Sequence, residues 1–144
     1  MSRDKENIKR FENGKVPEYK TKGASCADCY ARIESNVVID PMKNAIIPLG
    51  FALELPEGYE AEIRPRSGFA RKMIFSVQGT IDSDYRGECM VNIVNLSDKA
   101  FTIEPNERIC QMKITPSFQY RFNEVIELSE TERGSGGFGS TGTK

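Results

Sequence analysis

The stretch from Gly79 to Glu88, GTIDSDYRGE, concentrates residue types that can act on a ligand. Two aspartates, an aromatic ring and a guanidinium lie between glycines, which accept φ > 0 and let a ligand approach the backbone. The flanking segments 73–77 and 89–95 are predicted as strands, so we expect a β-hairpin whose tip carries chemical groups. An ordinary acidic turn with solvated side chains has the same composition, and this stretch alone leaves both interpretations open.

The chain contains no histidine. Its absence excludes Ser-His-Asp and Cys-His catalysis and a His-ligated catalytic zinc. Proton transfer at neutral pH must therefore fall to a carboxylate or to another group in its place.

Residues 64–72, RPRSGFARK, indicate a short helix with Ser67 near its N-cap. A hydroxyl and flanking arginines at a helix N-terminus suit a phosphate group. A plain capped turn of helix explains the same residues.

Four cysteines occur, and Cys26 and Cys29 are spaced as C-x-x-C. That motif is typical of redox or zinc sites, but a second closely spaced pair and a thioredoxin-like βαβ pattern are missing. We expect buried, reduced thiols rather than metal or redox chemistry.

Short apolar runs separated by turn signals follow one another along the chain. This spacing indicates an all-β sandwich, jelly roll or barrel. The runs occupy residues 45–47, 51–55, 59–63, 73–77, 90–94, 101–103, 109–114 and 125–128, after a strand-like region that ends at 37–39. Three parts are predicted: a polar, partly ordered lead-in over residues 1–22, a β domain over 23–131 and a flexible glycine-rich tail over 132–144.

With 144 residues, the chain is long enough for one domain with a core. Its net charge of −1 provides no field to recruit nucleic acid or a membrane surface, so neither is expected as a partner. No apolar run is long enough to span a membrane, and no signal peptide is recognisable. We expect an intracellular, cytoplasmic protein, or one acting in the nucleus or in a virus-infected cell, and not a secreted one.

The tail, ERGSGGFGSTGTK, combines one arginine, one phenylalanine and several hydroxyls with glycines. Such a segment cannot pack a core, but it could order around an anion. A flexible tail, an expression scar or an RGG-like RNA-binding segment are alternatives, and the last is disfavoured because the arginine is not repeated.

Five segments in order resemble the motifs of the trimeric deoxyuridine 5'-triphosphate nucleotidohydrolase (dUTPase) family. The first keeps the aspartate of the family's A-G-x-D-L pattern but not its glycine, and the fourth resembles R-I-A-Q with Cys110 at the small position. The five are residues 25–29 (SCADC), 65–70 (PRSGFA), 79–87 (GTIDSDYRG), 107–112 (ERICQM) and 133–142 (RGSGGFGSTG).

The resemblance implies an all-β jelly-roll or β-barrel chain that forms a homotrimer with shared sites and a mobile C-terminal tail. It implies hydrolysis of dUTP to dUMP and pyrophosphate with Mg²⁺, which limits uracil in DNA and supplies dUMP for dTMP synthesis. Asp82 matches the base that activates water, and Asp28 matches the position that holds Mg²⁺ through water. Phosphoryl chemistry of this kind depends on positioning and charge neutralisation.

The resemblance also implies a set of substrate-binding residues. Tyr85 would lie under the deoxyribose, Phe138 would stack on uracil, and Ile81 and Met90 would lie near the base, with Thr80 and Ser76 as weaker candidates. The phosphates would fall to Arg66, Ser67, Gly68 and Gln111 and, from the tail, to Arg133, Gly139, Ser140 and Thr141.

Two other functions remain open. A related jelly-roll enzyme that deaminates dCTP shares the fold but not the loop around Asp82 or the tail. A regulatory protein that binds a nucleotide or a protein partner on the same scaffold is the second alternative.

Overall fold

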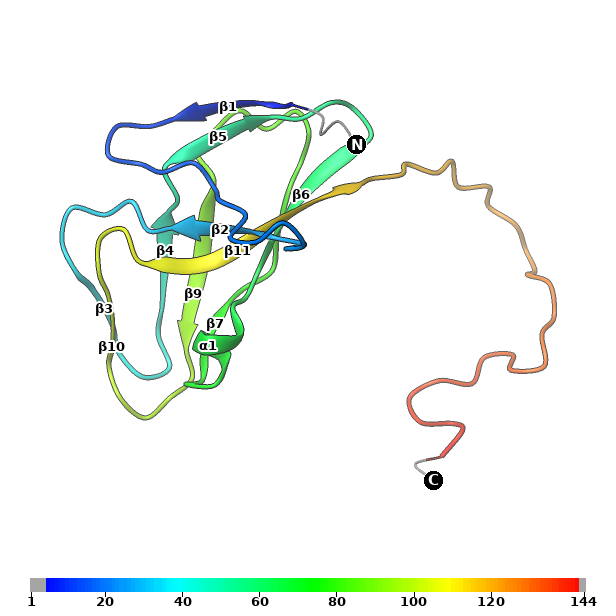
Figure 1. The fold of residues 1–144 in the computed structure, drawn as a ribbon. Helices are drawn as coiled ribbons and strands as arrows, with labels where there is room; N and C mark the ends of the chain where they lie inside the picture. The colour runs from blue at the N-terminus through cyan, green and yellow to red at the C-terminus, as the bar shows by residue number, and fades with distance from the viewer. Residues whose placement is uncertain (1–4, 143–144) are drawn as a thin grey trace.

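The computed structural model describes residues 5–142 and contains eleven strands and one short helix (Figure 1). Parts of the predicted lead-in (1–4) and tail (143–144) lie outside the described residues. The elements are β1 (Asn7–Arg10), β2 (Ala27–Tyr30), β3 (Val37–Ile39), β4 (Asn44–Pro48), β5 (Phe51–Glu54), β6 (Tyr59–Arg64), α1 (Ser67–Ala70), β7 (Ile74–Ser76), β8 (Gly79–Ile81), β9 (Met90–Asn95), β10 (Phe101–Ile103) and β11 (Arg108–Pro116).

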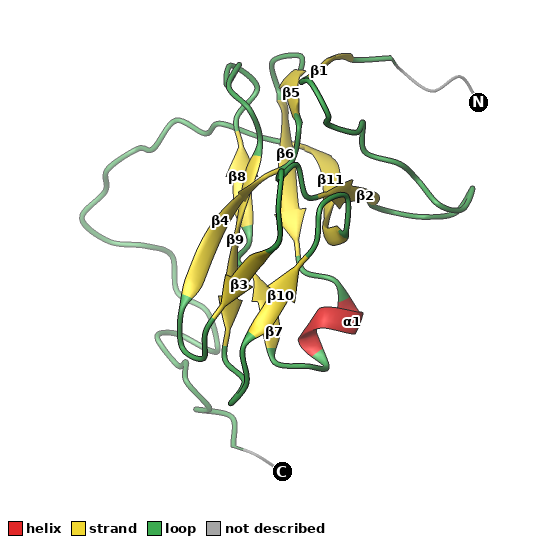
Figure 2. Cartoon of the chain, turned by 90° about the vertical axis from the view of Figure 1, so that its left-hand side faces the viewer, coloured by secondary structure: helices red, strands yellow, loops and turns green. Residues whose placement is uncertain are grey.

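Two sheets form the body of the molecule. One has the order β2-β11-β6-β8 and the other the order β4-β9-β7, and two-stranded ribbons β1-β5 and β3-β10 complete it (Figure 2). Strands alternate buried and exposed positions because successive side chains point to opposite faces. Ile63 and Ile81 from the first sheet and Ile47 and Ile93 from the second belong to a single buried cluster. The all-β prediction is confirmed, with open sheets rather than a closed barrel in the described part.

Residues before 23 join the domain more closely than the predicted lead-in suggests. Strand β1 pairs along its whole length with β5, and Glu18 forms a β-bridge with Asp28. The bridge covers one edge of β2 with two main-chain hydrogen bonds, from Asp28 N to Glu18 O (2.8 Å) and from Glu18 N to Asp28 O (3.1 Å).

The predicted hairpin around Asp82 differs from the one observed. Strand β7 does pair with β9, but β8 leaves that sheet and pairs instead with β6, so that Ile81 lies opposite Ala61. Residues 82–89 therefore cross from one sheet to the other. Glu88, near the end of this crossing, contacts Arg32 and Gly50, which lie in the loops after β2 and β4.

The predicted strand at residues 125–128 is wrong. The chain after Pro116 runs away from the body without forming a strand (Figure 1), and Ile126 and Leu128 are exposed. An apolar run needs a partner strand to satisfy its backbone groups, and none lies beside it in the described chain. No helix among the described residues is long and apolar enough to cross a membrane.

Candidate active site

Asp28, Arg66 and Gln111 lie at one end of the four-stranded sheet, which we call the phosphate end. Asp28 and Gln111 are directly opposite each other on β2 and β11, and Arg64, two residues before Arg66, is opposite Gln111 on β6. The side-chain amide of Gln111 donates to the carbonyl of Pro65 at 2.9 Å. The predicted phosphate and metal residues are thus brought together although they come from three separate segments.

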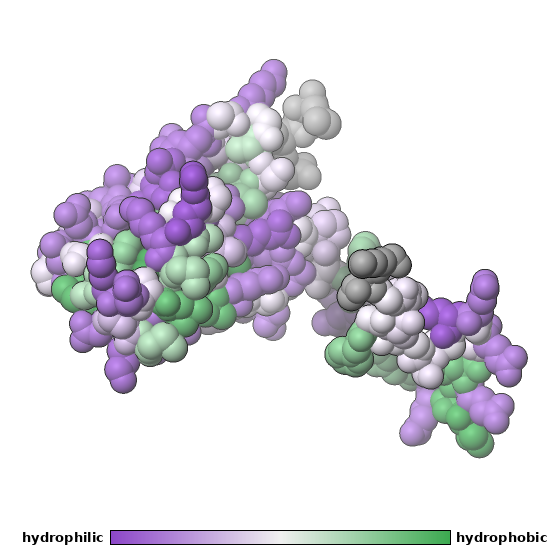
Figure 3. Space-filling model, turned by 90° about the horizontal axis from the view of Figure 1, so that it is seen from below, coloured by the Kyte–Doolittle hydropathy of each residue, from purple (hydrophilic) through white to green (hydrophobic). Residues whose placement is uncertain are grey.

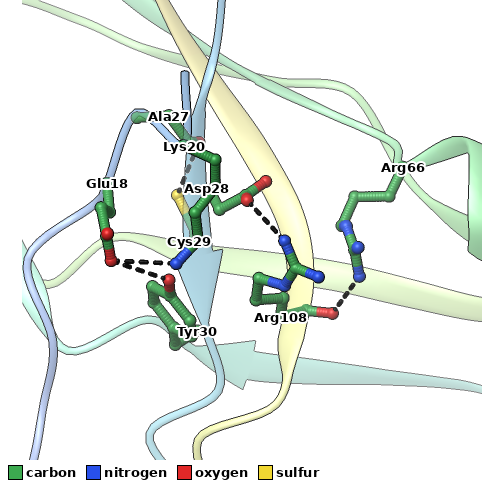
Figure 4. Close-up of polar contacts among 8 residues, drawn as sticks. All are labelled: Glu18, Lys20, Ala27, Asp28, Cys29, Tyr30, Arg66 and Arg108. Atoms are coloured by element: carbon green, nitrogen blue, oxygen red, sulfur yellow. Dashed lines mark hydrogen bonds and ion pairs between the residues drawn. The ribbon is translucent and has the colours of Figure 1, made fainter. Parts of the chain in front are cut away.

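Arg108 contacts both Asp28 and Arg66 at the phosphate end, and the sequence analysis did not predict this role. Its guanidinium Nη1 lies 3.0 Å from Asp28 Oδ2, and its carbonyl accepts a hydrogen bond of 2.7 Å from Arg66 Nη1 (Figure 4). The fourth motif contains Arg108, but only Gln111 was given a role. The signal available in the sequence was a cationic residue, Arg108, in the same motif as Gln111, which was predicted to bind substrate.

The short helix begins at Ser67 as predicted but ends at Ala70, before the predicted Lys72. Arg66 is its N-cap, and no side chain caps the helix. Ser67 and Gly68 are exposed in the first turn, whereas Phe69 is buried and packs edge-on against Phe101 with ring centroids 5.2 Å apart. Phe69 thereby anchors the turn, and Ser67 and Gly68 remain accessible to a ligand.

The first motif keeps its aspartate on a regular strand despite the missing glycine. Cys29 follows Asp28 on β2, is fully buried and lies opposite Cys110 on β11. The contact with Cys110, with burial, raises the pKa of the Cys29 thiol, and burial raises the pKa of Cys89 to about 12. All four cysteines are free in the described structure; Cys29, Cys89 and Cys110 are buried as expected, whereas Cys26 is half-buried.

The loop from Asp82 to Glu88 lies at the opposite end of this sheet. We call it the base end, after the uracil base that the sequence predicts there. Ile81, Asp82, Tyr85 and Met90 line a hollow of about 270 Å³, together with Thr80, Glu88 and Cys89. The carboxylate of Asp82 is exposed, and the carbonyl of Asp82 accepts a hydrogen bond from Tyr85 N at 3.1 Å, closing a turn. The residues predicted for catalysis, sugar and base therefore share one hollow.

Tyr85 is fixed within this loop. Its hydroxyl donates to the carbonyl of Glu88 at 3.0 Å, and its ring lies so close to Gly87 that a Cβ there would collide with it. A larger residue at position 87 would displace the Tyr85 ring from this position. Ser76, by contrast, is buried and its hydroxyl donates to the carbonyl of Ile109 at 2.9 Å, so that hydroxyl is occupied within the protein.

A partly buried ion pair between Arg32 and Glu88 holds the end of the loop. Arg32 donates to both carboxylate oxygens of Glu88, at 2.7 and 2.8 Å, and Gly50 N donates to Glu88 Oε2 at 2.9 Å. The Arg32 guanidinium lowers the pKa of the Glu88 carboxyl. A bidentate pair of this kind fixes the orientation of both side chains and adds the energy of two charge-assisted hydrogen bonds. Neither residue was singled out from the sequence, because they are far apart in the chain.

The tail residues are not brought to either end of the sheet. Figure 3 shows the tail as a separate mass beside the body, and Phe138 is fully exposed. Arg133 Nε donates to the carbonyl of Gly136 at 2.7 Å, and Gly139, Ser140 and Thr141 are also exposed. In a single chain, the five tail residues predicted to bind substrate lie apart from the others.

Comparison with known proteins identifies relatives along nearly the whole chain. Deoxyuridine 5'-triphosphate nucleotidohydrolases are similar to it: that of Hydrogenobaculum sp. is 50% identical over 136 residues (92% of this chain, 94% of the relative). That of Bdellovibrio bacteriovorus is 47% identical over 140 residues (94% of each chain).

Solved structures show the same architecture. The dUTPase of Staphylococcus bacteriophage 80alpha with dUpNHpp matches with a TM-score of 0.89 and 28% identity, covering 98% of this chain and 100% of the other. A phage phi11 dUTPase, whose structure concerns the coordination of a structural Mg(II) ion, matches with a TM-score of 0.79 at 22% identity and covers 86% of this chain and 98% of the other; this likeness shows the fold alone. The dUTPase family description matches residues 12–142. The chain belongs to the dUTPase family.

Proposed function

We propose that this protein hydrolyses dUTP to dUMP and pyrophosphate, as a homotrimer that uses Mg²⁺. The observation that carries the proposal is the hollow lined by Ile81, Asp82, Tyr85 and Met90 in a chain of this family. The same hollow contains a carboxylate, a hydrogen-bonded aromatic ring and the free edge of a strand. Each of these has a distinct part in the proposed reaction.

Asp82 is the proposed general base. It follows directly on β8, so the sheet sets its position, and its side chain is exposed to water. The carboxylate would take a proton from the water that attacks the α-phosphorus. A positioned base contributes about 10²- to 10⁴-fold to rate.

Strand β8 supplies the groups that read uracil. It is the last strand of its sheet and pairs with β6 on one side only, so the described sheets leave main-chain N–H and C=O groups on its other side. An edge strand is a template for hydrogen bonding. Uracil O2, N3–H and O4 match such groups, whereas cytosine has the opposite polarity at positions 3 and 4.

Tyr85 is the proposed filter against ribonucleotides. Its hydroxyl donates to the Glu88 carbonyl and its ring lies against Gly87, and these two contacts set the position of the ring. A ring held beside C2′ of the sugar leaves no space for a 2′-hydroxyl. UTP is then rejected by steric exclusion.

The phosphate end fits a magnesium ion that keeps its water shell. Asp28 offers a hard carboxylate, and no group of three or more His, Cys, Asp or Glu that could hold a metal occurs within residues 5–142. Mg²⁺ is commonly bound through one or two carboxylates plus substrate phosphates, with retained waters. Bound there, the ion would neutralise charge on the triphosphate, while Arg66, Ser67, Gly68 and Gln111 orient it.

The geometry of one chain argues for sites shared between chains. Asp82 continues β8 at the level of Thr115 on β11, whereas Asp28 is opposite Gln111, four residues away along β11. At standard strand spacings this separates Asp82 from Asp28 by about 13 Å along the strands and about 14 Å across them. One chain therefore does not place both on one α-phosphate, and we propose that each site joins the base end of one subunit to the phosphate end of another.

Exposed apolar side chains support the proposed trimer. Ile46 and Met90 are 64% and 50% exposed on the outer face of the three-stranded sheet, and Phe118 and Phe122 are 75% and 98% exposed in the segment after β11. Apolar surface of this kind marks association surfaces. We place the tail of one subunit over the site formed by two others, inside the cell, where the free thiols stay reduced.

The experiment that tests this function measures pyrophosphate release from dUTP, UTP, dCTP and dTTP by the full chain with Mg²⁺. We expect turnover of dUTP and rates at least about 100-fold lower with the other three, since a site built on hydrogen bonds discriminates strongly. The absence of pyrophosphate from dUTP would overturn the proposal. Ammonia release from dCTP would instead support the deaminase alternative.

A further inference from the structure

We infer that Arg108 is a positioning residue that fixes, from one position on β11, both the metal-side carboxylate of Asp28 and the phosphate-side guanidinium of Arg66. The inference rests on the proposed function. It assigns a role to a side chain that need not touch the substrate.

The side chain of Arg108 controls one oxygen of Asp28. Nη1 of Arg108 lies 3.0 Å from Oδ2, and the Asp28 side chain is only 15% exposed. Among residues 5–142 the other oxygen, Oδ1, accepts no hydrogen bond from a protein group. One oxygen is thus oriented by the guanidinium, and the other remains for a metal-bound water.

The main-chain carbonyl of Arg108 orients the side chain of Arg66. The carbonyl of Arg108 accepts a hydrogen bond of 2.7 Å from Arg66 Nη1, and the Arg66 guanidinium carbon lies 5.7 Å from the centroid of the Phe69 ring. A guanidinium has five N–H donors. Holding one of them on a carbonyl orients the group and leaves others for a phosphate.

A bulge in β11 directs the Arg108 side chain to Asp28. The register with β2 shifts between Arg108, which is opposite Tyr30, and Cys110, which is opposite Cys29. Bulges re-aim side chains next to active sites. Arg108 therefore reaches diagonally to Asp28 (Figure 4), while Ile109 is buried in the core.

The test is Arg108→Gln in the full-length protein, with binding of dUpNHpp measured by calorimetry at a series of Mg²⁺ concentrations and in EDTA. Mg²⁺ should tighten dUpNHpp binding, and we expect the Mg²⁺ concentration that gives half of this effect to rise about 10-fold in the variant. Loss of a residue that holds a metal ligand in place has an effect of this size. Affinity in EDTA should change little, because residue 108 keeps its carbonyl for Arg66. Arg108→Lys keeps the charge without the fork and should recover part of the Mg²⁺ effect.

The matched control is Arg64→Gln, on the neighbouring strand β6. Arg64 pairs with Glu62 at 2.7 Å, and the exposures of that pair, 39% and 18%, are close to the 44% and 15% of Arg108 and Asp28. Losing a surface ion pair of the same kind there should leave the Mg²⁺ dependence unchanged. A thermal melt of each variant reports whether it is folded.

Two results would overturn the inference: an unchanged Mg²⁺ requirement in folded Arg108→Gln, or an equal shift in Arg64→Gln. If Arg108→Gln does not fold, Arg108→Lys decides, because an unchanged Mg²⁺ requirement in that variant would count against the inference. The proposed function fails separately, when the wild-type protein neither binds dUpNHpp nor releases pyrophosphate from dUTP.

Discussion

The two ends of the four-stranded sheet are built in different ways. At the phosphate end, groups that would meet the ligand, Asp28 and Arg66, are held by hydrogen bonds to the side chain and carbonyl of Arg108. At the base end, Asp82 makes no such side-chain contact within the described residues, and the loop is held from behind by Glu88.

This difference determines how each end of the sheet responds to an amino-acid substitution. Ligand groups at the phosphate end are coupled, so one substitution alters several of them. At the base end, the carboxylate of Asp82, the proposed base, stays free to contact water, and Glu88, which holds the loop, is several residues away. Changes in Asp82 should therefore affect the chemical step alone, while changes in Glu88 should affect the stability of the loop.

The largest effect is expected from Asp82→Asn. Turnover of dUTP should fall by about 10²- to 10⁴-fold, because the amide cannot take the proton from water, while dUpNHpp binding is retained. Steady-state pyrophosphate release and calorimetric binding measure the two quantities. Substantial remaining turnover would show that another group is the base.

The same variant tests whether the two ends act in different subunits. Arg66→Gln, which changes only the phosphate end, should also be nearly inactive. Trimers assembled from both variants should regain part of the activity, since some of their sites then combine an intact base end with an intact phosphate end. Mixed trimers with no recovered activity would place both ends of a site in one chain.

Removal of residues 133–144 should have the next largest effect. The truncated protein should remain folded and keep the proposed trimeric state, because the described tail residues 133–142 make no strand with the body. Loss of the proposed contact from Arg133 to phosphate would remove about 1.5–3 kcal/mol of charge-assisted hydrogen bonding, or about 10- to 100-fold in kcat/KM. Wild-type rates from the truncated protein, with its size checked by light scattering, would remove the tail from the reaction.

The sequence predicted the strands well where local pattern determines them. The alternation in β6 and β9 places Ile63 and Ile93 in the core, as a period of two requires. It could not predict that β8 would join β6, because partner choice depends on the whole sheet. It also placed a strand at 125–128, where an apolar run has no partner in the described chain.

The candidate site shows the same division between local and distant information. Asp82, Tyr85 and Met90 lie close in sequence and share a hollow, as the motif predicted. Arg108 was missed because its partner Asp28 is 80 residues away. Contacts across strands are set by register, which a single sequence does not display.

The smallest effect is expected from Glu88→Gln, which should change the stability of the protein rather than its chemical step. The hydrogen bonds from the Arg32 guanidinium lower the pKa of the Glu88 carboxyl below its ordinary value. A carboxyl with a lowered folded-state pKa stabilises the protein above the unfolded pKa, and this contribution is lost as the pH falls through the folded pKa.

At pH 7, Glu88→Gln should lower the free energy of unfolding by about 1–2 kcal/mol, because it removes charge-assisted bonds to a half-buried Arg32. As the pH falls below the unfolded-state pKa of a glutamate, about 4.3, the wild type should lose stability more steeply than the variant, so the two curves approach each other. Urea unfolding at pH 7 and at several acidic pH values measures this difference. Parallel curves would show that Glu88 does not titrate with folding, and that the hydrogen bonds from Arg32 and Gly50 hold the loop without a charge on Glu88.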